Sequence, residues 1–282
     1  YCEAFFEREY RLDYLIHTYS KPTIVWGHGV VMGGGLGIAS ACQYRIGTEK
    51  TRIAMPEITI GLIPDAGATW SFVQMPEYFA NFLALTGAQI NGADAQKVGL
   101  VNHLLLNEYK AETLAALLQQ VDAADPSAGI TTVLEVHKDT GEFPASQLEE
   151  HEALIKDVMT QCLSAENPVA SFVDALPKFA ENPWLAKAAA AFSNGAPTTA
   201  QIIVEQFRRA KTMGLKDMLI QELTLATQCS RHPDFAEGVR ALLIDKDGEP
   251  KWQHAEMGAV PKEYIDAHFT SPWDTHPLND LD

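Results

Sequence analysis

Two acidic residues and a run of glycines are the groups in this sequence whose types and spacing could do chemistry. Glu57 follows Met-Pro in the segment AMPEITIGLIPDAG, and Asp65 follows the second proline of that segment. A proline disfavours helix in the residue before it and lacks an N–H, so we expect Glu57 at a strand end rather than inside a helix. A buried carboxyl group has a raised pKa and can serve as a general base or a nucleophile.

The alternative for Glu57 and Asp65 is a solvated position on surface loops, where most single acidic residues lie. Their spacing does not place them on one face of a helix, so the two can meet only through loop geometry. The residues between them, 58–63, read ITIGLI, an apolar segment that predicts burial. Burial of this segment favours the chemical interpretation over the solvated one.

The glycine run, Gly33–Gly35, opens a short apolar segment that we expect to be a helix ending near Cys42. Glycine inside a helix costs roughly 0.5–1 kcal/mol relative to alanine, so the run needs a reason. One reason is the approach of a ligand oxyanion to free N–H groups at the helix N-terminus, and the other is tight helix-on-strand packing without a ligand. The phosphate-loop pattern G-x-x-x-x-G-K-[ST] does not occur.

Short strands and helices are expected around these groups. Apolar runs at residues 23–26, 44–47 and 52–54 predict three buried strands. Residues 3–17 have helical spacing and carry Glu9, either as a solvated acid or as part of the site. Further helices are expected at residues 66–85 with a break near Pro76, 93–98 and 111–121, and a further strand at 101–106.

The second half of the chain is expected to be mainly helical. Residues 122–147 are rich in Ala, Asp, Pro and Gly and predict a surface insertion or linker. We therefore divide the chain into a core, residues 1–122, and a helical C-terminal region, residues 123–282. Helices are expected at residues 148–162, 169–179, 198–209, 215–230 and 235–245, with Thr198 near the N-cap of the third and an irregular surface tail at 269–282.

Composition and charge exclude several classes of partner. The chain has 282 residues and a net charge of −16, from 21 Lys and Arg against 37 Asp and Glu. Nucleic-acid binding depends on neutralisation of phosphates by basic side chains, so a nucleic-acid partner is excluded. No apolar run approaches the ~20 residues that span a bilayer, so no membrane partner is expected. The four cysteines form no C-x-x-C pair, which predicts a reducing compartment, no zinc site and no disulfide framework.

Several segments together resemble the crotonase, or enoyl-CoA hydratase/isomerase, superfamily. These are HGVVMGGGLGI, AMPEITIGLIPDAG and LALTGAQINGADAQKVGLV, while FFEREY and HPDFAEGVRALLIDKDGEPKW resemble its 3-hydroxyisobutyryl-CoA hydrolase branch. The resemblance spans nearly the whole chain and implies an α/β fold, a crotonase-like ββα spiral core with a helical C-terminal region. It also implies that the N-terminal part of the fold is absent from this sequence, and with it a second oxyanion donor and part of the coenzyme A site.

By this resemblance, five residues form the site. Gly34 supplies one backbone N–H to the oxyanion of the acyl group, and Gly33 lies beside it in the substrate-binding site. Glu57 is the main catalytic carboxylate. Asp65, a second catalytic and substrate-binding residue, completes the acyl pocket together with Glu9.

Two departures from the hydratase pattern favour hydrolysis over hydration. Hydratases that resemble this chain have a second Glu where this sequence has Gly37 and a Gly where it has Asp65. Addition of water to a double bond needs two carboxylates, so hydration loses one partner here. The predicted reaction is hydrolysis of a short 3-hydroxyacyl-CoA thioester, with 3-hydroxyisobutyryl-CoA of valine catabolism as the favoured substrate. Glu57 then acts as a general base or as a nucleophile, and the sequence leaves both open.

The alternatives are an enoyl-CoA hydratase or isomerase, and a catalytically silent acyl-CoA-binding subunit, which the fold alone would permit. Coenzyme A is part of the substrate, and no metal or redox cofactor is expected. The partner is therefore a small-molecule acyl-CoA, and the oligomeric state, including a homo-oligomer, is left open. The expected location is the cytoplasm of a bacterium or the mitochondrial matrix of a eukaryote, with the cytoplasm favoured.

Overall fold

Two three-stranded sheets form the β part of the fold, and α2 (Gly34–Ala41) leads from one sheet to the other. The computed structural model describes residues 1–122, 124–138 and 140–282. In one sheet β3 (Tyr44–Gly47) lies in parallel between β1 (Ile24–Gly27) and β6 (His103–Leu104). In the other, β4 (Arg52–Ala54) pairs in parallel with β2 (Val30–Met32) and antiparallel with β5 (Ile90–Asn91).

Parallel pairing of β2 with β4 brings the glycine run beside the segment that carries Glu57. Met32, the last residue of β2, pairs with Ala54, the last residue of β4. Because the two strands are parallel, both chains leave the sheet at the same edge. The start of α2 and the 3₁₀ helix η1 (Glu57–Ile60) are therefore held close together.

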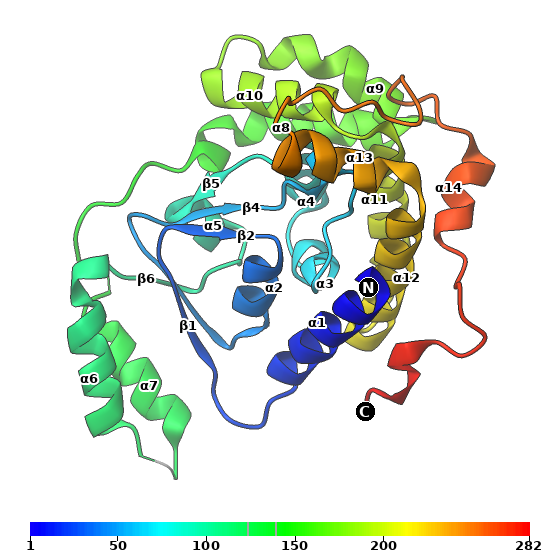
Figure 1. The fold of residues 1–282 in the computed structure, drawn as a ribbon. Coiled ribbons are helices and arrows are strands. Elements are labelled where there is room, and N and C mark those ends of the chain that lie inside the picture. Colours follow the sequence, from blue (N-terminus) through cyan, green and yellow to red (C-terminus); the bar gives the residue numbers. More distant parts are fainter. Residues whose placement is uncertain (123, 139) are drawn as a thin grey trace.

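Helices surround the sheets on several sides (Figure 1). α1 (Cys2–His17) lies along α12 (Leu215–Arg231) and also packs against α2. The other helices of the first half are α3 (Ala68–Val73), α4 (Glu77–Thr86), α5 (Gly92–Lys97), the 3₁₀ helix η2 (Asn107–Tyr109) and α6 (Lys110–Gln120).

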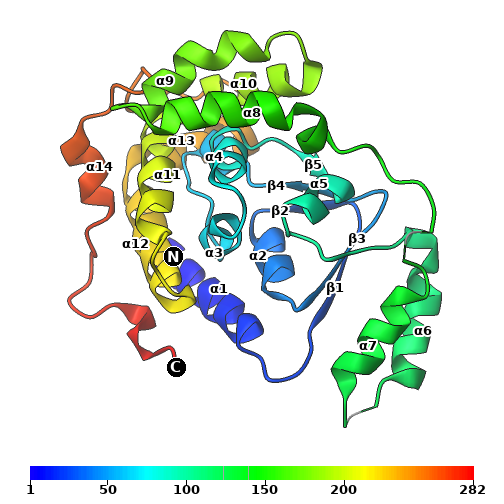
Figure 2. The ribbon, with the colours of Figure 1, turned by 180° about the vertical axis from the view of Figure 1, so that it is seen from behind.

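The second half is mainly helical, as predicted. Figure 2 shows α8, α9 and α10 across one end of the molecule, with the α6–α7 pair and α12 on opposite sides of it. The helices are α7 (Pro126–Glu135), α8 (Gln147–Leu163), α9 (Pro168–Ala175), η3 (Leu176–Phe179), α10 (Pro183–Asn194), α11 (Pro197–Ala210), α13 (Pro233–Val239), the π-helical η4 (Arg240–Ile244), α14 (Lys262–His268) and η5 (Pro277–Asp280).

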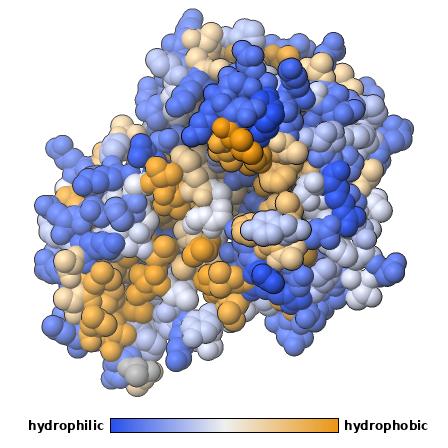
Figure 3. Space-filling model, viewed as in Figure 1, coloured by the Kyte–Doolittle hydropathy of each residue, from blue (hydrophilic) through white to orange (hydrophobic). Residues whose placement is uncertain are grey.

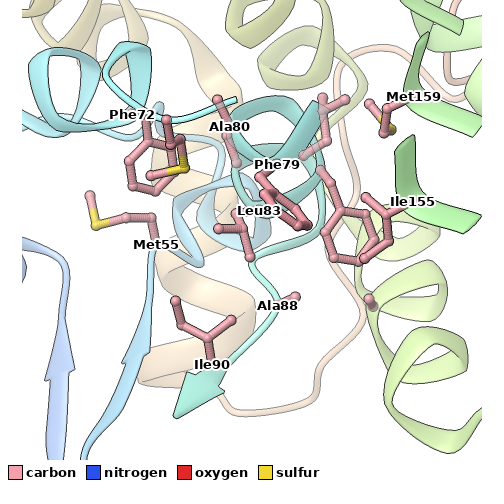
Figure 4. Packing of buried hydrophobic residues seen from close by; sticks show 14 of the residues in the cluster. Met55, Phe72, Phe79, Ala80, Leu83, Ala88, Ile90, Ile155 and Met159 are labelled. Atoms are coloured by element: carbon pink, nitrogen blue, oxygen red, sulfur yellow. The ribbon is translucent and has the colours of Figure 1, made fainter. Parts of the chain in front are cut away.

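The main core lies between α4 and the helices of the second half. Phe79 of α4 faces Ile155 and Met159 of α8 (Figure 4), and all three are buried. On the same helix, Phe82 makes an edge contact with Phe179, with ring centroids 5.8 Å apart. The cluster of buried residues contains side chains from both sides of residue 122, where we placed the domain boundary. That boundary stays a prediction.

The stretch at residues 122–147, predicted to be a surface insertion or linker, contains a packed helix, so the linker alternative was wrong for much of its length. α7 begins at an N-cap, Asp125, whose side chain accepts from the N–H of Ala128. It packs against α6 and buries Leu134 in a small cluster with residues of β3. The high content of Ala and Gly concealed this N-cap signal. Residues 123 and 139 of the stretch lie outside the described residues.

Two helix starts also differ from the predictions, and proline explains both. α11 begins at Pro197 with Ala196 as N-cap, so Thr198 lies inside the first turn and does not cap it. α10, which is not among the helices predicted above, begins at Pro183, and the Asn182 side chain caps it. Proline is well tolerated in the first helical turn because its missing N–H has no partner there in any case.

The C-terminal tail and Glu57 need corrections of a similar kind. Residues 269–282 contain η5 and pack against α1, where the hydroxyl of Tyr14 donates to the carbonyl of Asp282 over 2.7 Å. Leu278 is fully buried, so the tail is not an irregular surface segment. Glu57 is the first residue of η1 rather than the last residue of a strand, because β4 ends at Ala54.

Some large apolar side chains remain on the surface. Figure 3 shows apolar residues gathered around a hollow in the face that is seen in Figure 1. Ile244, at the end of η4, is 69% exposed and Val30 of β2 is 58% exposed. Within the described residues, no helix has the length and apolar character needed to cross a membrane.

Candidate active site

Glu57 lies buried against the glycine run. Its side chain is 6% exposed, and a Cβ placed on Gly33 would be 3.2 Å from its Oε1. Oε2 is buried and has no hydrogen-bond partner among the described residues. The parallel pairing of β2 with β4 thus places the carboxyl group of Glu57 beside the start of α2. The first N–H groups of a helix have no intrahelical partners.

Glu9 reaches the same point from α1. A Cβ on Gly34 would collide with Oε1 of Glu9, so the carboxyl group occupies the space that a side chain at position 34 would need. Glu9 is partly buried, and desolvation raises its pKa. The side chain of Glu9 therefore belongs to the pocket and not to the solvated face of its helix.

Asp65 is the third carboxyl group of the site. It is 5% exposed, and its Oδ2 accepts a hydrogen bond of 2.6 Å from the hydroxyl of Tyr10. Burial raises the pKa of Asp65 to about 8, although the bond from Tyr10 works in the opposite direction. Burial also raises the pKa of Glu57 well above its ordinary value, and the negative charges of Asp65 and Glu9 add to that effect. The structure therefore brings the predicted acids into one electrostatically coupled group.

The loop that carries Asp65 is fixed by a residue far along the chain. Glu222 of α12 is fully buried and accepts from the N–H of Gly67 over 2.7 Å and from the N–H of Thr69 over 2.8 Å. These N–H groups lie at the N-terminus of α3, where a carboxylate is favourable. Gln206 of α11 donates to the hydroxyl of Thr69 over 2.6 Å.

The segment HPDFAEG packs directly behind η1. Gly61 has a φ of 70°, and a Cβ there would be 2.6 Å from the carbonyl oxygen of Asp234. α13 packs on η1 through this close approach. A motif near the end of the chain thus supports the turn that holds Glu57.

The space beside Gly37, where the resemblance to hydratases implies a second acid, is closed in this structure. A Cβ on Gly37 would lie 2.6 Å from both the Cβ and the carbonyl oxygen of Ala66. Ala66 follows Asp65 and is fully buried, with an unusual φ of 54° for a residue other than glycine. A larger side chain at position 37 would require this backbone to move.

The structure brings Glu9, Gly33, Gly34, Glu57 and Asp65 together, as predicted, although their catalytic roles stay predictions. Sequence reasoning missed further residues that surround the site. Tyr10 lies on the helix predicted for residues 3–17 but was not assigned to the site. Asp13, one turn after Glu9, and Glu222 were not considered; the spacing of four residues from Glu9 could have indicated Asp13, whereas no local pattern indicates Glu222.

The described residues contain no candidate metal cluster, and their large cavity lies apart from this site. No group of three or more His, Cys, Asp or Glu side chains there is arranged to hold a metal ion. A cavity of about 740 Å³ lies between α4, α11 and α14, and its lining contains none of the predicted site residues. The basic residues of its lining are already paired: Arg208 with Glu205, Lys211 with Glu77 and Lys262 with Asp266.

Known proteins similar to this chain agree on its family. Residues 1–269 match a family model described as enoyl-CoA hydratase/isomerase. A Danio rerio protein named 3-hydroxyisobutyryl-CoA hydrolase, mitochondrial, is 33% identical over 273 residues, which cover 95% of this chain and 69% of that protein. The Homo sapiens protein of the same name is 34% identical and covers 95% of this chain and 68% of its own length.

Solved structures show the same fold. The crystal structure of a carnitinyl-CoA dehydratase from Mycobacterium thermoresistibile has a TM-score of 0.83 and 30% identity, covering 99% of this chain and 76% of that chain. An enoyl-CoA hydratase from Rhodobacter sphaeroides has a TM-score of 0.81 and 26% identity, covering 96% and 74%. The predicted crotonase-like α/β fold with a helical C-terminal region is confirmed. The chain belongs to the enoyl-CoA hydratase/isomerase family.

Proposed function

We propose that this protein hydrolyses the thioester of a short 3-hydroxyacyl-CoA, with 3-hydroxyisobutyryl-CoA as its substrate. The observation that carries the proposal is the arrangement of acids: Glu57 lies at the start of α2, whereas position 37, where hydratases have their second acid, is closed by Ala66. The names of the relatives from Danio rerio and Homo sapiens support the same reaction. The two similar solved structures are named as a dehydratase and a hydratase, so a direct comparison of the two reactions is needed.

In the proposed reaction, the thioester oxygen accepts a hydrogen bond from the N–H of Gly34 as negative charge develops on it. Glu57 removes a proton from water, and the water oxygen attacks the carbonyl carbon. The carbon–sulfur bond then breaks, and the sulfur of coenzyme A takes up the proton that Glu57 removed from water, so that coenzyme A leaves as the thiol and Glu57 is ionised again. Alternatively, Glu57 attacks the carbonyl itself, and water hydrolyses the resulting mixed anhydride.

The acyl pocket would recognise the substrate hydroxyl through its acids. Oδ2 of Asp65 is used by Tyr10, and we assign Oδ1 to the hydroxyl, with Glu9 beside it. Two carboxyl groups in a mostly apolar pocket need donors, and a hydroxyl is a donor whereas an alkyl chain is not. Sites of this kind can reject the analogue that lacks the hydroxyl by up to about 10⁴-fold.

The test is a comparison of three substrates with the purified protein. Thiol release should be much faster from 3-hydroxyisobutyryl-CoA than from isobutyryl-CoA, and crotonyl-CoA should be hydrated slowly or not at all. Equal kcat/KM for the two thioesters, or faster hydration than hydrolysis, would contradict the proposal. Tight coenzyme A binding without turnover would identify a silent binding subunit. A single turnover in heavy-oxygen water separates the two routes, because only the anhydride route leaves the label in Glu57.

For the location we propose the cytoplasm or the mitochondrial matrix. None of the four cysteines is paired in a disulfide in the described part of the chain, which suits a reducing compartment. The names of the two relatives include the word mitochondrial. Fractionation of source cells, with the protein detected by antibody, would decide between the two compartments.

A further inference from the structure

A carboxyl group that the proposed mechanism does not use lies behind the acyl pocket. Asp13 is one helical turn after Glu9 on α1, so the two side chains share one face of the helix. Its side chain is 0% exposed. Neither of its oxygens has a hydrogen-bond partner anywhere in residues 1–122, 124–138 or 140–282. An ionised carboxylate in such a place carries a large desolvation cost without compensation.

The charged groups that face Asp13 from other elements are acids. Asp65 comes from the loop before α3 and Glu222 from α12, and both act on Asp13 with negative charge, as does Glu9 from its own helix. α2, which also packs on α1, has the sequence GGLGIASA and contributes no titratable side chain. The cations of α12 are used elsewhere, because Lys216 donates to the carbonyl oxygens of Asn279 and Leu281 and Arg231 pairs with Glu3. η5, which also packs on α1, carries Asp280, which is paired with Arg11. The charges that act on Asp13 are therefore all negative.

The remaining titratable groups on this part of α1 do not help Asp13 either. The hydroxyl of Tyr10 is used by Asp65. His17, one turn after Asp13, is kept neutral because burial, followed by the charge of Arg45, lowers its pKa to about 4.

The acids of this cluster differ in the donors that they receive. Asp65 accepts from the Tyr10 hydroxyl, and Glu222 accepts from two backbone N–H groups at the start of α3. Asp13 receives none from the residues that the structure covers. Repulsion between neighbouring carboxylates allows only some of these acids to be ionised. The acid that receives no hydrogen bond then retains its proton.

We propose that Asp13 is a positioning residue that works as a neutral acid, and that its ionisation sets the alkaline limit of turnover. With its proton in place, Glu222 can hold the Asp65 loop and Glu9 can face the substrate. An ionised Asp13 would repel a carboxylate about 6 Å away. At an effective dielectric constant of about 20, this repulsion corresponds to about a 10²-fold lower rate. Burial, followed by the charge of Glu9, raises the pKa of Asp13 to about 8, which indicates where this limit should lie. The kinetic part of this inference rests on the proposed function.

The kinetic test is the pH profile of kcat/KM for Asp13→Asn, which has the same shape and no charge at any pH. Its rate at about pH 7 should be within about 2-fold of the wild type, and its alkaline decline should begin at least about one pH unit higher. Asp174→Asn, at an exposed position on α9, is the matched control and should keep the wild-type profile. An unchanged alkaline decline in Asp13→Asn, or a folded but inactive variant at neutral pH, overturns the proposal.

A second measurement does not need turnover. At neutral pH the infrared spectrum of Asp13→Asn should lack one protonated-carboxyl C=O band that the wild type has, and Asp174→Asn should keep all the wild-type bands; an unchanged set of bands in Asp13→Asn overturns the proposal. If no thioester is cleaved by the wild type, the proposed function fails while this band still decides the state of Asp13. Asp13→Leu serves as a second neutral variant, and failure of both to fold would show that the charged form is required.

Discussion

The hydroxyl of Tyr10 donates a hydrogen bond of 2.6 Å to Oδ2 of Asp65 and thereby connects α1 to the loop before α3. Both side chains are buried, Tyr10 at 0% and Asp65 at 5% exposure. The bond lowers the pKa of Asp65 against the stronger effect of burial, so it favours the charged form of that acid. The group that we assign to the substrate hydroxyl is thus oriented by a residue that is itself out of contact with solvent.

Replacement of Tyr10 by Phe should therefore weaken selection of the hydroxylated substrate. Asp65 loses its side-chain donor, so its pKa should rise further and its carboxyl group should become less well oriented. We expect about a 10-fold lower kcat/KM for 3-hydroxyisobutyryl-CoA and a loss of about 1–3 kcal/mol in the free energy of unfolding. Tyr14→Phe, on the same helix but bonded to the C-terminal residue, is the control and should leave selectivity unchanged. Wild-type selectivity in Tyr10→Phe would show that Asp65 needs no such support.

Replacement of Glu57 by Gln should abolish hydrolysis while acyl-CoA binding persists. Loss of a positioned acid or base costs about 10²–10⁴-fold in rate, and loss of a nucleophile costs more. Thiol release and equilibrium binding of a non-cleavable acyl-CoA analogue measure the two effects separately. Glu77→Gln, at an exposed residue paired with Lys211, should retain full turnover. Near-normal turnover of Glu57→Gln would remove this residue from the mechanism.

Alanine substitutions at Gly34 and Gly35 should distinguish a role in the active site from a role in helix packing. Gly34→Ala places a methyl group where Oε1 of Glu9 lies, at the end of a flexible side chain, so the protein should fold with Glu9 displaced. We expect at least about a 10-fold fall in kcat for the hydroxylated thioester. At Gly35 a Cβ would meet no atom of the described residues within 4 Å, so Gly35→Ala should keep activity and gain up to about 1 kcal/mol of helix stability. Equal activities of the two variants would argue for a packing role alone.

The free energy of unfolding should fall as the pH rises from about 5 to about 8. Burial raises the pKa of Asp13 from 3.8 to about 8, and burial also raises that of Asp65 from 3.8 to about 8. In this window the unfolded chain has released protons that the folded chain still binds, so each step upward in pH favours unfolding. Urea denaturation at a series of pH values measures the slope, which Asp65→Asn should make shallower. A stability that increases across this window would contradict the assignment.

Local patterns predicted several of the elements that carry the site, although not β2 or η1. The strands at residues 44–47 and 52–54 have the predicted bounds, because short apolar runs between turns define them closely. The helix of Glu9 and the helix after the glycine run were also confirmed. Spacing alone left open whether Glu57 and Asp65 are buried; the apolar segment between them favoured burial, and the structure shows them 6% and 5% exposed.

Other parts of the site depend on contacts that no local pattern contains. Glu222 meets the N–H groups of Gly67 and Thr69 from more than 150 positions away in the sequence. Asp13 resembles any helical acid until the packing of α12 and the Asp65 loop around α1 is known. The helix within residues 122–147 was missed for another reason, because its composition outweighed the capping signal at its start.

The contact between Gly37 and Ala66 limits how this protein could change its chemistry over evolutionary time. Introduction of an acid at position 37 is the obvious first step toward a hydratase, yet the backbone at residue 66 already fills that space. Gly37→Glu would then yield a poorly folded intermediate before it yielded a new activity. An evolving protein could acquire an acid at position 37 only after the turn at residue 66 had changed. Laboratory selection for hydration should therefore recover substitutions in that turn before any acid at position 37.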